Sequence, residues 1–191
     1  MNSMKTHGFS INIFLPDGEP EGVRIVEKSL WTGLGLVCPR SLFSETKRRP
    51  EFQKTGVYVL VGTSDETGNP RMYVGEGDPV LNRLNDHYTK KEFLTTAIFF
   101  TSKDANLNKA HVQYLESRLI TLAREAKQCD LDNGNFPALP SLSEAEIAYM
   151  EGFLYNMLHC FPVLGVRFFE KPDESSKGRK IKWLYIILEP F

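Results

Sequence analysis

The stretch Gly56–Gly75 decides how the chain folds, and it reads GVYVLVGTSDETGNPRMYVG. Valine and tyrosine fill both ends of the stretch, and these residues favour the pleated, half-buried surface of a strand. The middle, Gly62–Pro70, is rich in the glycine, serine, aspartate, asparagine and proline that form turns. We therefore predict a β-hairpin with strands at Gly56–Gly62 and Arg71–Gly75, each carrying one tyrosine.

The segments after the hairpin predict helix, strand and helix. A short helix is expected at Pro79–Tyr88, with Asp78 as its N-cap and proline at its first position. A third strand is expected at Leu94–Thr101, and a long helix at Leu107–Ala126 with Asn106 as its cap. The central part is therefore predicted to be an α+β domain, a small three-stranded sheet flanked by helices.

The chain before this central part predicts a small α+β unit over residues 1–50. Strands are expected at Phe9–Leu15 and Gly33–Val37, and helices at Glu19–Leu30 and Ser41–Lys47. The helix at 19–30 is expected because Val23, Val26 and Leu30 recur at helical spacing. This unit carries no catalytic group of residues, and we consider it a candidate surface for docking a protein partner.

The chain after the central part predicts an extension over residues 137–191. Ser143, with Glu146 three residues later, is expected to form a capping box that begins a helix ending near His159. A final strand pair is expected at Val163–Glu170 and Lys182–Leu188. Three units, 1–50, 55–136 and 137–191, are thus predicted.

Arg83 and His87 are the first candidates for chemistry. They are four residues apart in a predicted helix, so they share one face. Arginine can hold a phosphate through two hydrogen bonds and keeps its charge at any working pH. His87 could act as a general base or contact a phosphate. Structural alternatives are a salt bridge of Arg83 with Asp86, and a favourable charge of His87 near the end of the helix dipole.

Glu116 is the third candidate. Val112 and Ile120, one turn before and after it, place its carboxylate at or near the apolar face of the long helix. An unpaired charge there is costly. Mg²⁺ would satisfy it, since this ion binds one or two protein carboxylates together with waters and phosphate oxygens. The alternative is a glutamate at the edge of the core that is hydrated or pairs with Arg118 or Arg124.

The ordered set of residues resembles the GIY-YIG nuclease family. Gly56-Val57-Tyr58 stands in place of the first signature of that family, and Tyr73-Val74-Gly75 stands in place of the second. Arg83, His87 and Glu116 then follow in the order of the family. The resemblance covers roughly residues 55–136, less than half of the chain.

The resemblance implies a metal-dependent endonuclease that hydrolyses phosphodiester bonds and leaves a 5′-phosphate. Tyr58 would be the general base toward the attacking water, and Tyr73 would position water or phosphate. Arg83 would stabilise the charge of the phosphorane, and Glu116 would hold one Mg²⁺, which Mn²⁺ can replace. By the same analogy DNA is favoured over RNA as the substrate. Without the resemblance, both tyrosines are explained as good strand formers.

Supporting residues are also implied. The family pattern ends on an asparagine that supports the site, and Asn133 and Asn135 both fall in the loop after the glutamate helix. Each is also an ordinary turn residue, and we favour Asn133 for the catalytic role, with Asn135 near the substrate. Gly56 and Gly75 are expected to allow close packing of the backbone around the site.

Lys109, in the first turn of the long helix, is a candidate contact for a substrate phosphate. A capped and solvated first turn is the structural alternative. Glu76 directly follows the second signature, where its charge could repel a nucleic acid or its side chain could face solvent. This supports a second hypothesis, a catalytically silent module on the same fold that binds nucleic acid or protein.

Composition excludes several classes of protein. The net charge of the 191 residues is −1, whereas a protein that depends on non-specific affinity for DNA is usually basic. No apolar run approaches the ~20 residues of a membrane helix, and the first residues contain no signal-peptide stretch, so no membrane partner is expected. Cys38, Cys129 and Cys160 are widely separated and form neither a disulfide framework nor a zinc motif. A cytoplasmic location is therefore expected.

Overall fold

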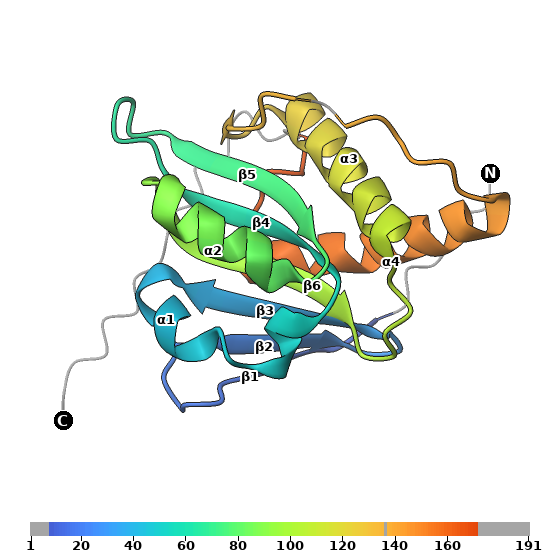
Figure 1. Cartoon of the computed structure of the whole chain (residues 1–191), viewed down its shortest axis with the longest axis horizontal. Helices are drawn as coiled ribbons and strands as arrows, with labels where there is room; N and C mark the ends of the chain where they lie inside the picture. The colour runs from blue at the N-terminus through green and yellow to red at the C-terminus, as the bar shows by residue number, and fades with distance from the viewer. Residues whose placement is uncertain (1–7, 136, 172–191) are drawn as a thin grey trace.

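The hairpin predicted at 56–75 lies inside a seven-stranded sheet in the computed structural model, which describes residues 8–135 and 137–171 (Figure 1). The strands are β1 (Ile11–Phe14), β2 (Arg24–Lys28), β3 (Gly33–Pro39), β4 (Gly56–Thr63), β5 (Pro70–Gly77), β6 (Leu94–Ser102) and β7 (Asp130–Leu131). The helices are η1 (Arg40–Leu42), α1 (Phe43–Thr46), η2 (Pro50–Gln53), α2 (Val80–Lys90), α3 (Lys109–Ala126) and α4 (Glu144–Val163).

The order of the strands across the sheet is β1-β2-β3-β6-β4-β5-β7. Neighbouring strands are antiparallel except β5 and β7, which are parallel, so the sheet is mixed. The fold is therefore α+β, as predicted, but the sheet is wider than the three strands expected. Strand β3 pairs with β6 from Gly33↔Ser102 to Pro39↔Thr96, and through this pairing the first strands of the chain extend the sheet of the central hairpin.

Alternation along β4 separates two hydrophobic layers, because successive side chains of a strand point to opposite faces. Val57 and Val59 pack on one face, where α3 and α4 supply most of the cover. Tyr58 and Leu60 pack on the other face, together with side chains of α1, η2 and α2. In Figure 1, α2 crosses in front of the sheet while α4 passes behind it. The two tyrosines therefore belong to the layer of α2.

Several sequence predictions were wrong in detail. Residues 19–30 contain the strand β2 in place of the expected helix, because Ile25 and Val26 are β-branched and the segment pairs with β1 on one side and β3 on the other. The caps lie one or two residues later than expected. Pro79 precedes α2, and Asn108 caps α3 by accepting a hydrogen bond from the backbone N–H of His111 at 2.9 Å.

The C-terminal extension follows the prediction in its helix only. Ser143 and Glu146 form the expected capping box at the start of α4. The segment after α4 forms turns where a strand was expected at 163–170, and residues 182–188 lie outside the described residues. Within the described residues, no helix is both long and apolar enough to span a membrane.

Candidate active site

Two tyrosines and a histidine form the centre of the candidate site. Strand pairing places Tyr58 opposite Gly75 and Leu60 opposite Tyr73, so the tyrosines are diagonal neighbours on one face of the sheet. Their ring centroids are 6.4 Å apart. The ring of His87, from α2, lies 5.5 Å from that of Tyr58 and 4.8 Å from that of Tyr73. The structure thus brings these three predicted residues into one cluster.

Glycine is required where Tyr58 crosses β5. A Cβ atom on Gly75 would lie 2.3 Å from the Tyr58 hydroxyl oxygen and 2.4 Å from the ring carbon that carries it. At Gly56 a Cβ atom would lie 2.5 Å from the carbonyl oxygen of Phe100. Both glycines therefore permit close approach, and Gly75 provides the space that the Tyr58 ring occupies.

Tyr58 is bonded to His87. The phenol oxygen lies 2.7 Å from Nε2 of His87. Burial, together with the nearby charges of Lys91 and Arg83, lowers the pKa of His87 to about 4. The imidazole is therefore neutral at pH 7, and its unprotonated Nε2 can accept the phenol hydrogen. Burial also raises the pKa of Tyr58 far above its ordinary value, as does its neighbour Tyr73, so a free phenolate is disfavoured here.

Arg83 lies one turn before His87 on α2 and is exposed. Within the described residues its guanidinium forms no ion pair, so the salt bridge with Asp86 that was considered as an alternative is not formed. Its charge acts on both tyrosines and on Glu116, and it lowers the pKa of each. Arg83 is therefore a cation at the surface of the cluster that is free to meet an anion.

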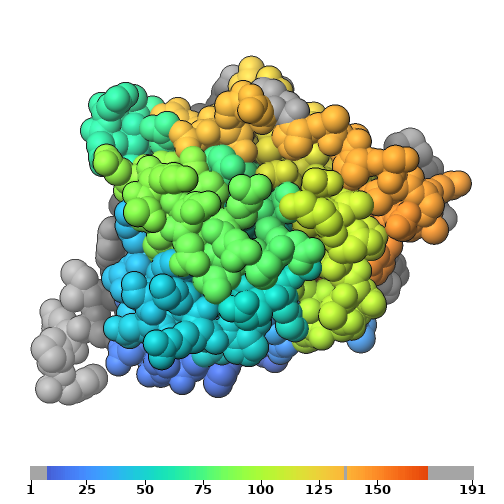
Figure 2. Space-filling view, in the orientation of Figure 1, coloured from blue at the N-terminus to red at the C-terminus, as the bar shows by residue number. Residues whose placement is uncertain are grey.

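Glu116 approaches from the helix on the other side of β5. In Figure 1 the C-terminal end of β5 emerges between α2 and α3, and Figure 2 shows both helices on the same face of the molecule. Burial and the charge of Glu76 raise the pKa of Glu116 to about 7, against the opposing charges of Lys109 and Arg83. Neither hydrogen bond nor ion pair satisfies its carboxylate within residues 8–135 and 137–171. Glu116 is thus a half-buried carboxylate without a partner.

Lys109 and Glu76 form an ion pair beside Glu116. Nζ of Lys109 lies 2.5 and 2.7 Å from the two carboxylate oxygens of Glu76. The sequence alone suggests a repulsive charge at Glu76 and a separate candidate phosphate contact at Lys109. The structure pairs them, so the ammonium of Lys109 balances the charge of Glu76.

The structure separates the two candidate asparagines. Oδ1 of Asn133 accepts a hydrogen bond from the backbone N–H of Val74 at 2.9 Å, and its Nδ2 donates to the carbonyl oxygen of Val74 at 2.8 Å. Asn133 is therefore fixed to the strand that carries Tyr73. Asn135 is exposed and is not among the residues that the structure brings together.

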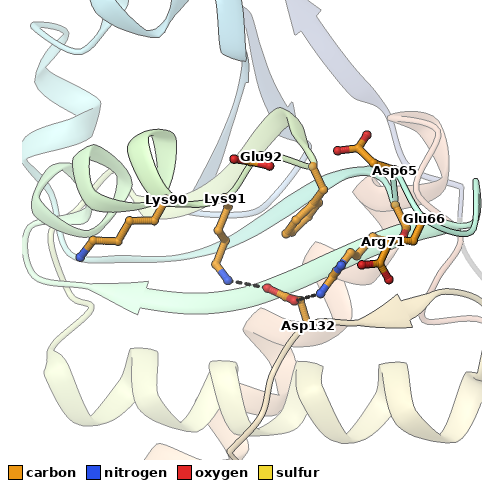
Figure 3. Close-up of a pocket in the computed structure, with 9 residues that line it drawn as sticks. Asp65, Glu66, Arg71, Lys90, Lys91, Glu92 and Asp132 are labelled. Carbon is orange, nitrogen blue, oxygen red and sulfur yellow. Dashed lines mark hydrogen bonds and ion pairs between the residues drawn. The ribbon is translucent and has the colours of Figure 1, made fainter.

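Three further residues adjoin the cluster and were not singled out from the sequence. Asp132 forms ion pairs with Arg71 and Lys91, and Nζ of Lys91 lies 3.9 Å from the centroid of the Tyr73 ring. In Figure 3 the side chains of Arg71 and Lys91 approach the Asp132 carboxylate from its two sides. These residues line a cavity of about 340 Å³ next to Tyr73. The one local signal in the sequence that could have pointed to them is the adjacent basic pair Lys90-Lys91.

The residues present fit a Mg²⁺ ion better than a metal that needs a full protein cage. In the part of the chain that the structure describes, no group of three or more His, Cys, Asp or Glu side chains could hold a metal. Glu116 offers an unpaired carboxylate, and Glu76 is a second carboxylate close enough to raise its pKa. Mg²⁺ binds through one or two carboxylates and takes its other ligands from water and substrate phosphate.

The chain was compared with family models, with curated proteins and with solved structures, and no match was found in any of the three comparisons.

Proposed function

We propose that the protein is a metal-dependent endonuclease that hydrolyses phosphodiester bonds, with DNA favoured over RNA. The observation that carries the proposal is the cluster itself. The 2.7 Å contact between Tyr58 and His87 lies beside an arginine and a half-buried carboxylate, neither of which has an ion-pair partner among the described residues. An arginine and a metal-binding carboxylate beside a proton acceptor are the groups that phosphodiester hydrolysis needs. The order of these residues also resembles that of the GIY-YIG nucleases.

Proton transfer in this proposal passes through Tyr58 to His87. As water attacks phosphorus, the phenol oxygen of Tyr58 takes the proton of the water while its own proton passes to Nε2 of His87. The oxygen of the water bonds to phosphorus and the bond to the 3′-oxygen breaks, so a 5′-phosphate forms and the 3′-oxygen takes a proton from solvent. The transient imidazolium of His87, whose pKa is lowered, then returns its proton to solvent and restores the site. Because both transfers occur together, Tyr58 does not need to become a free phenolate, which its raised pKa disfavours.

The other residues act on the phosphate. Arg83 is exposed and stabilises the charge that develops on the phosphorane oxygens. Glu116, with Glu76 nearby, would hold Mg²⁺. The bound ion would supply positive charge to the phosphate and to the departing oxygen. Asn133 keeps the backbone of β5 in place next to Tyr73.

A second candidate function is a nucleic-acid-binding or protein-interaction module that does not cleave. Two observations favour it. Tyr58 is 1% exposed, which limits the access of water to its phenol, and the net charge of the chain is −1. A protein of this charge binds nucleic acid through a local surface and not through its overall field.

The test is cleavage of supercoiled and single-stranded DNA with Mg²⁺ or Mn²⁺. We expect the wild type to cut and Glu116→Ala and Tyr58→Phe to lose at least about a hundredfold in rate, because each removes a group that acts in the transition state. Glu125→Ala is the matched control, since this exposed glutamate lies further along α3. Equal cutting by the wild type and Glu116→Ala would contradict the proposal. Binding without cutting by the wild type, on DNA and RNA, would favour the second candidate.

A further inference from the structure

Lys91 lies where the cluster meets the cavity of Figure 3. It follows the last residue of α2, and its Nζ lies 3.9 Å from the centroid of the Tyr73 ring, within the range of a cation–π contact. The same Nζ lies 2.5 Å from Oδ2 of Asp132. The side chains of Lys91 and Asp132 are only 17% and 18% exposed, so solvent screens their interaction less than it screens a surface pair.

Asp132 is fixed in turn by the strand that carries Tyr73. Its backbone N–H donates to the carbonyl oxygen of Met72 at 2.7 Å, and Arg71 binds its other carboxylate oxygen. Despite partial burial, these two cations lower the pKa of Asp132 below its ordinary value, so the carboxylate is charged at neutral pH. Asp132 therefore holds the ammonium of Lys91 in a defined position relative to β5.

The backbone of Lys91 is fixed by Arg40, a residue of η1. Nη1 of Arg40 donates to the carbonyl oxygen of Lys91 at 2.6 Å, and Nη2 donates to that of Tyr88 at 2.8 Å. The main chain and the ammonium of Lys91 are thus both anchored, which leaves its side chain little freedom to leave the Tyr73 ring.

We propose that Lys91 is a positioning residue of the candidate site: held by Asp132, its ammonium lies on the ring of Tyr73 and keeps this ring against His87. The expected effect of Lys91 on activity rests on the proposed nuclease function, whereas its expected effect on the position of the Tyr73 ring does not. Lys91 does not contact substrate in this proposal. Its charge is used within the protein, by Asp132 and by the ring of Tyr73.

The test compares Lys91→Met, which removes the ammonium, with Lys91→Arg, which keeps a cation. Lys90→Met is the matched control, because Lys90 is adjacent and exposed and its side chain points away from Asp132 in Figure 3. We expect Lys91→Met to lower kcat about tenfold with KM within about twofold, as for the loss of a largely desolvated cation–π contact. Lys91→Arg should recover most of the loss, and Lys90→Met should behave as wild type. A rise in KM at unchanged kcat would overturn the proposal, since Lys91 would then be a substrate contact.

A second readout does not depend on activity. NMR titration of His87 reports its surroundings, which include Tyr58 on β4, Tyr73 on β5, and Arg83, Asp86, Lys90 and Lys91 on or next to α2. After burial, the charge of Lys91 is the largest cause of the lowered pKa of His87, and that of Lys90 is a smaller one. Lys91→Met should therefore raise the pKa of His87 more than Lys90→Met does, and should shift the ring resonances of Tyr73.

The two readouts separate the two proposals. If the wild type does not cleave but Lys91→Met shifts the Tyr73 and His87 resonances, the nuclease proposal fails and the structural role of Lys91 stands. If Lys91→Met is folded, as shown by its thermal unfolding, and leaves both sets of resonances at their wild-type positions, the role of Lys91 is overturned. Asp132→Asn provides an independent check, because it should produce the same shifts by releasing Lys91.

Discussion

Glu116 illustrates how a single residue can be unfavourable for folding and useful for function. Its carboxylate lies half-buried on α3 beside Glu76, and its pKa is raised to about 7 as a result. A protein selected for stability alone would place an amide or an apolar side chain here. A bound cation would favour the charged carboxylate and so oppose the effects of burial and of Glu76 on the pKa, which agrees with the proposed metal site.

The first prediction concerns Glu116→Gln. Because the folded pKa lies above the ordinary value of 4.5, the stability linked to Glu116 is fully present below pH 4.5 and is lost as pH rises through about 7. At pH 8 the glutamine variant should therefore be more stable than wild type by about 1 kcal/mol, after allowance for solvent screening. At pH 4 the two should be equal. Urea unfolding at both pH values measures the difference, and equal stability at pH 8 would show that Glu116 is not destabilised when charged.

The second prediction concerns His87→Gln. The folded pKa of His87 is about 4, below its ordinary value of 6.5, so the linked stability is present above pH 6.5 and is lost as pH falls toward 4. As pH falls from 6.5 to 4, the free energy of unfolding of the wild type should decrease by about 1 kcal/mol relative to that of His87→Gln. This value already allows for solvent screening of the half-buried imidazole. Urea unfolding at pH 7.5 and pH 4.5 checks this. A difference that does not change with pH would mean that His87 is not buried as a neutral imidazole.

At the scale of elements, the segment 130–133 determines the outer edge of the site. Strand β7 pairs with β5 in parallel, from Arg71↔Asp130 to Met72↔Leu131. Asp132 and Asn133 then continue along the same strand through hydrogen bonds to Met72 and Val74. A short segment is thus attached to the length of β5 that contains Tyr73. The position of the Tyr73 ring is set from this side as well as from α2.

The third prediction follows for Asn133→Ala. The substitution leaves the backbone N–H and carbonyl of buried Val74 without their side-chain partner, which should cost ~1–3 kcal/mol of unfolding free energy. Asn135→Ala, at an exposed position in the same loop, should change stability by less than about 0.5 kcal/mol. Chemical unfolding of both variants is the measurement. A similar small effect at the two positions would contradict the structural role assigned to Asn133.

At the scale of the whole molecule, the sheet joins parts of the chain that the sequence analysis assigned to separate units. Strand β3 covers one edge of β6 along its length, and Phe43 of α1 stacks on Tyr88 of α2 with ring centroids 3.7 Å apart. Arg40 adds hydrogen bonds to the end of α2. The helix that carries Arg83 and His87 therefore rests on residues from the first fifty positions.

The fourth prediction tests this dependence. A fragment that begins at Glu51 lacks β1 to β3, which exposes the edge of β6 and one part of the layer around Tyr58. We expect it to lack a cooperative unfolding transition, as followed by circular dichroism. The full chain with Arg40→Ala, which keeps all strands, should unfold cooperatively but at lower stability by ~2 kcal/mol, since several carbonyls at the end of α2 lose their donor. Cooperative unfolding of the fragment would show that residues 55–136 form an independent unit.

Local features of this chain were determined by the sequence alone. The hairpin at 56–75 follows from β-branched and aromatic residues around a run of turn formers, and α4 begins at Ser143 because of a capping box of four consecutive positions. The shared face of Arg83 and His87 follows from helical spacing. Each of these depends on residues within a few positions of one another, so intrinsic propensity and side-chain capping are enough to specify it.

Only the tertiary structure decided the rest. Residues 19–30 have apolar spacing typical of a helix, yet strands on both sides pair with 24–28 and provide hydrogen bonds that a sequence window does not contain. The pairing of Lys91 with Asp132 joins positions 41 residues apart, and that of Glu76 with Lys109 joins positions 33 apart. Tertiary contacts decide which charges are neutralised and which, like Glu116 within the described part of the chain, have no ion-pair partner. No local preference encodes how distant side chains come together.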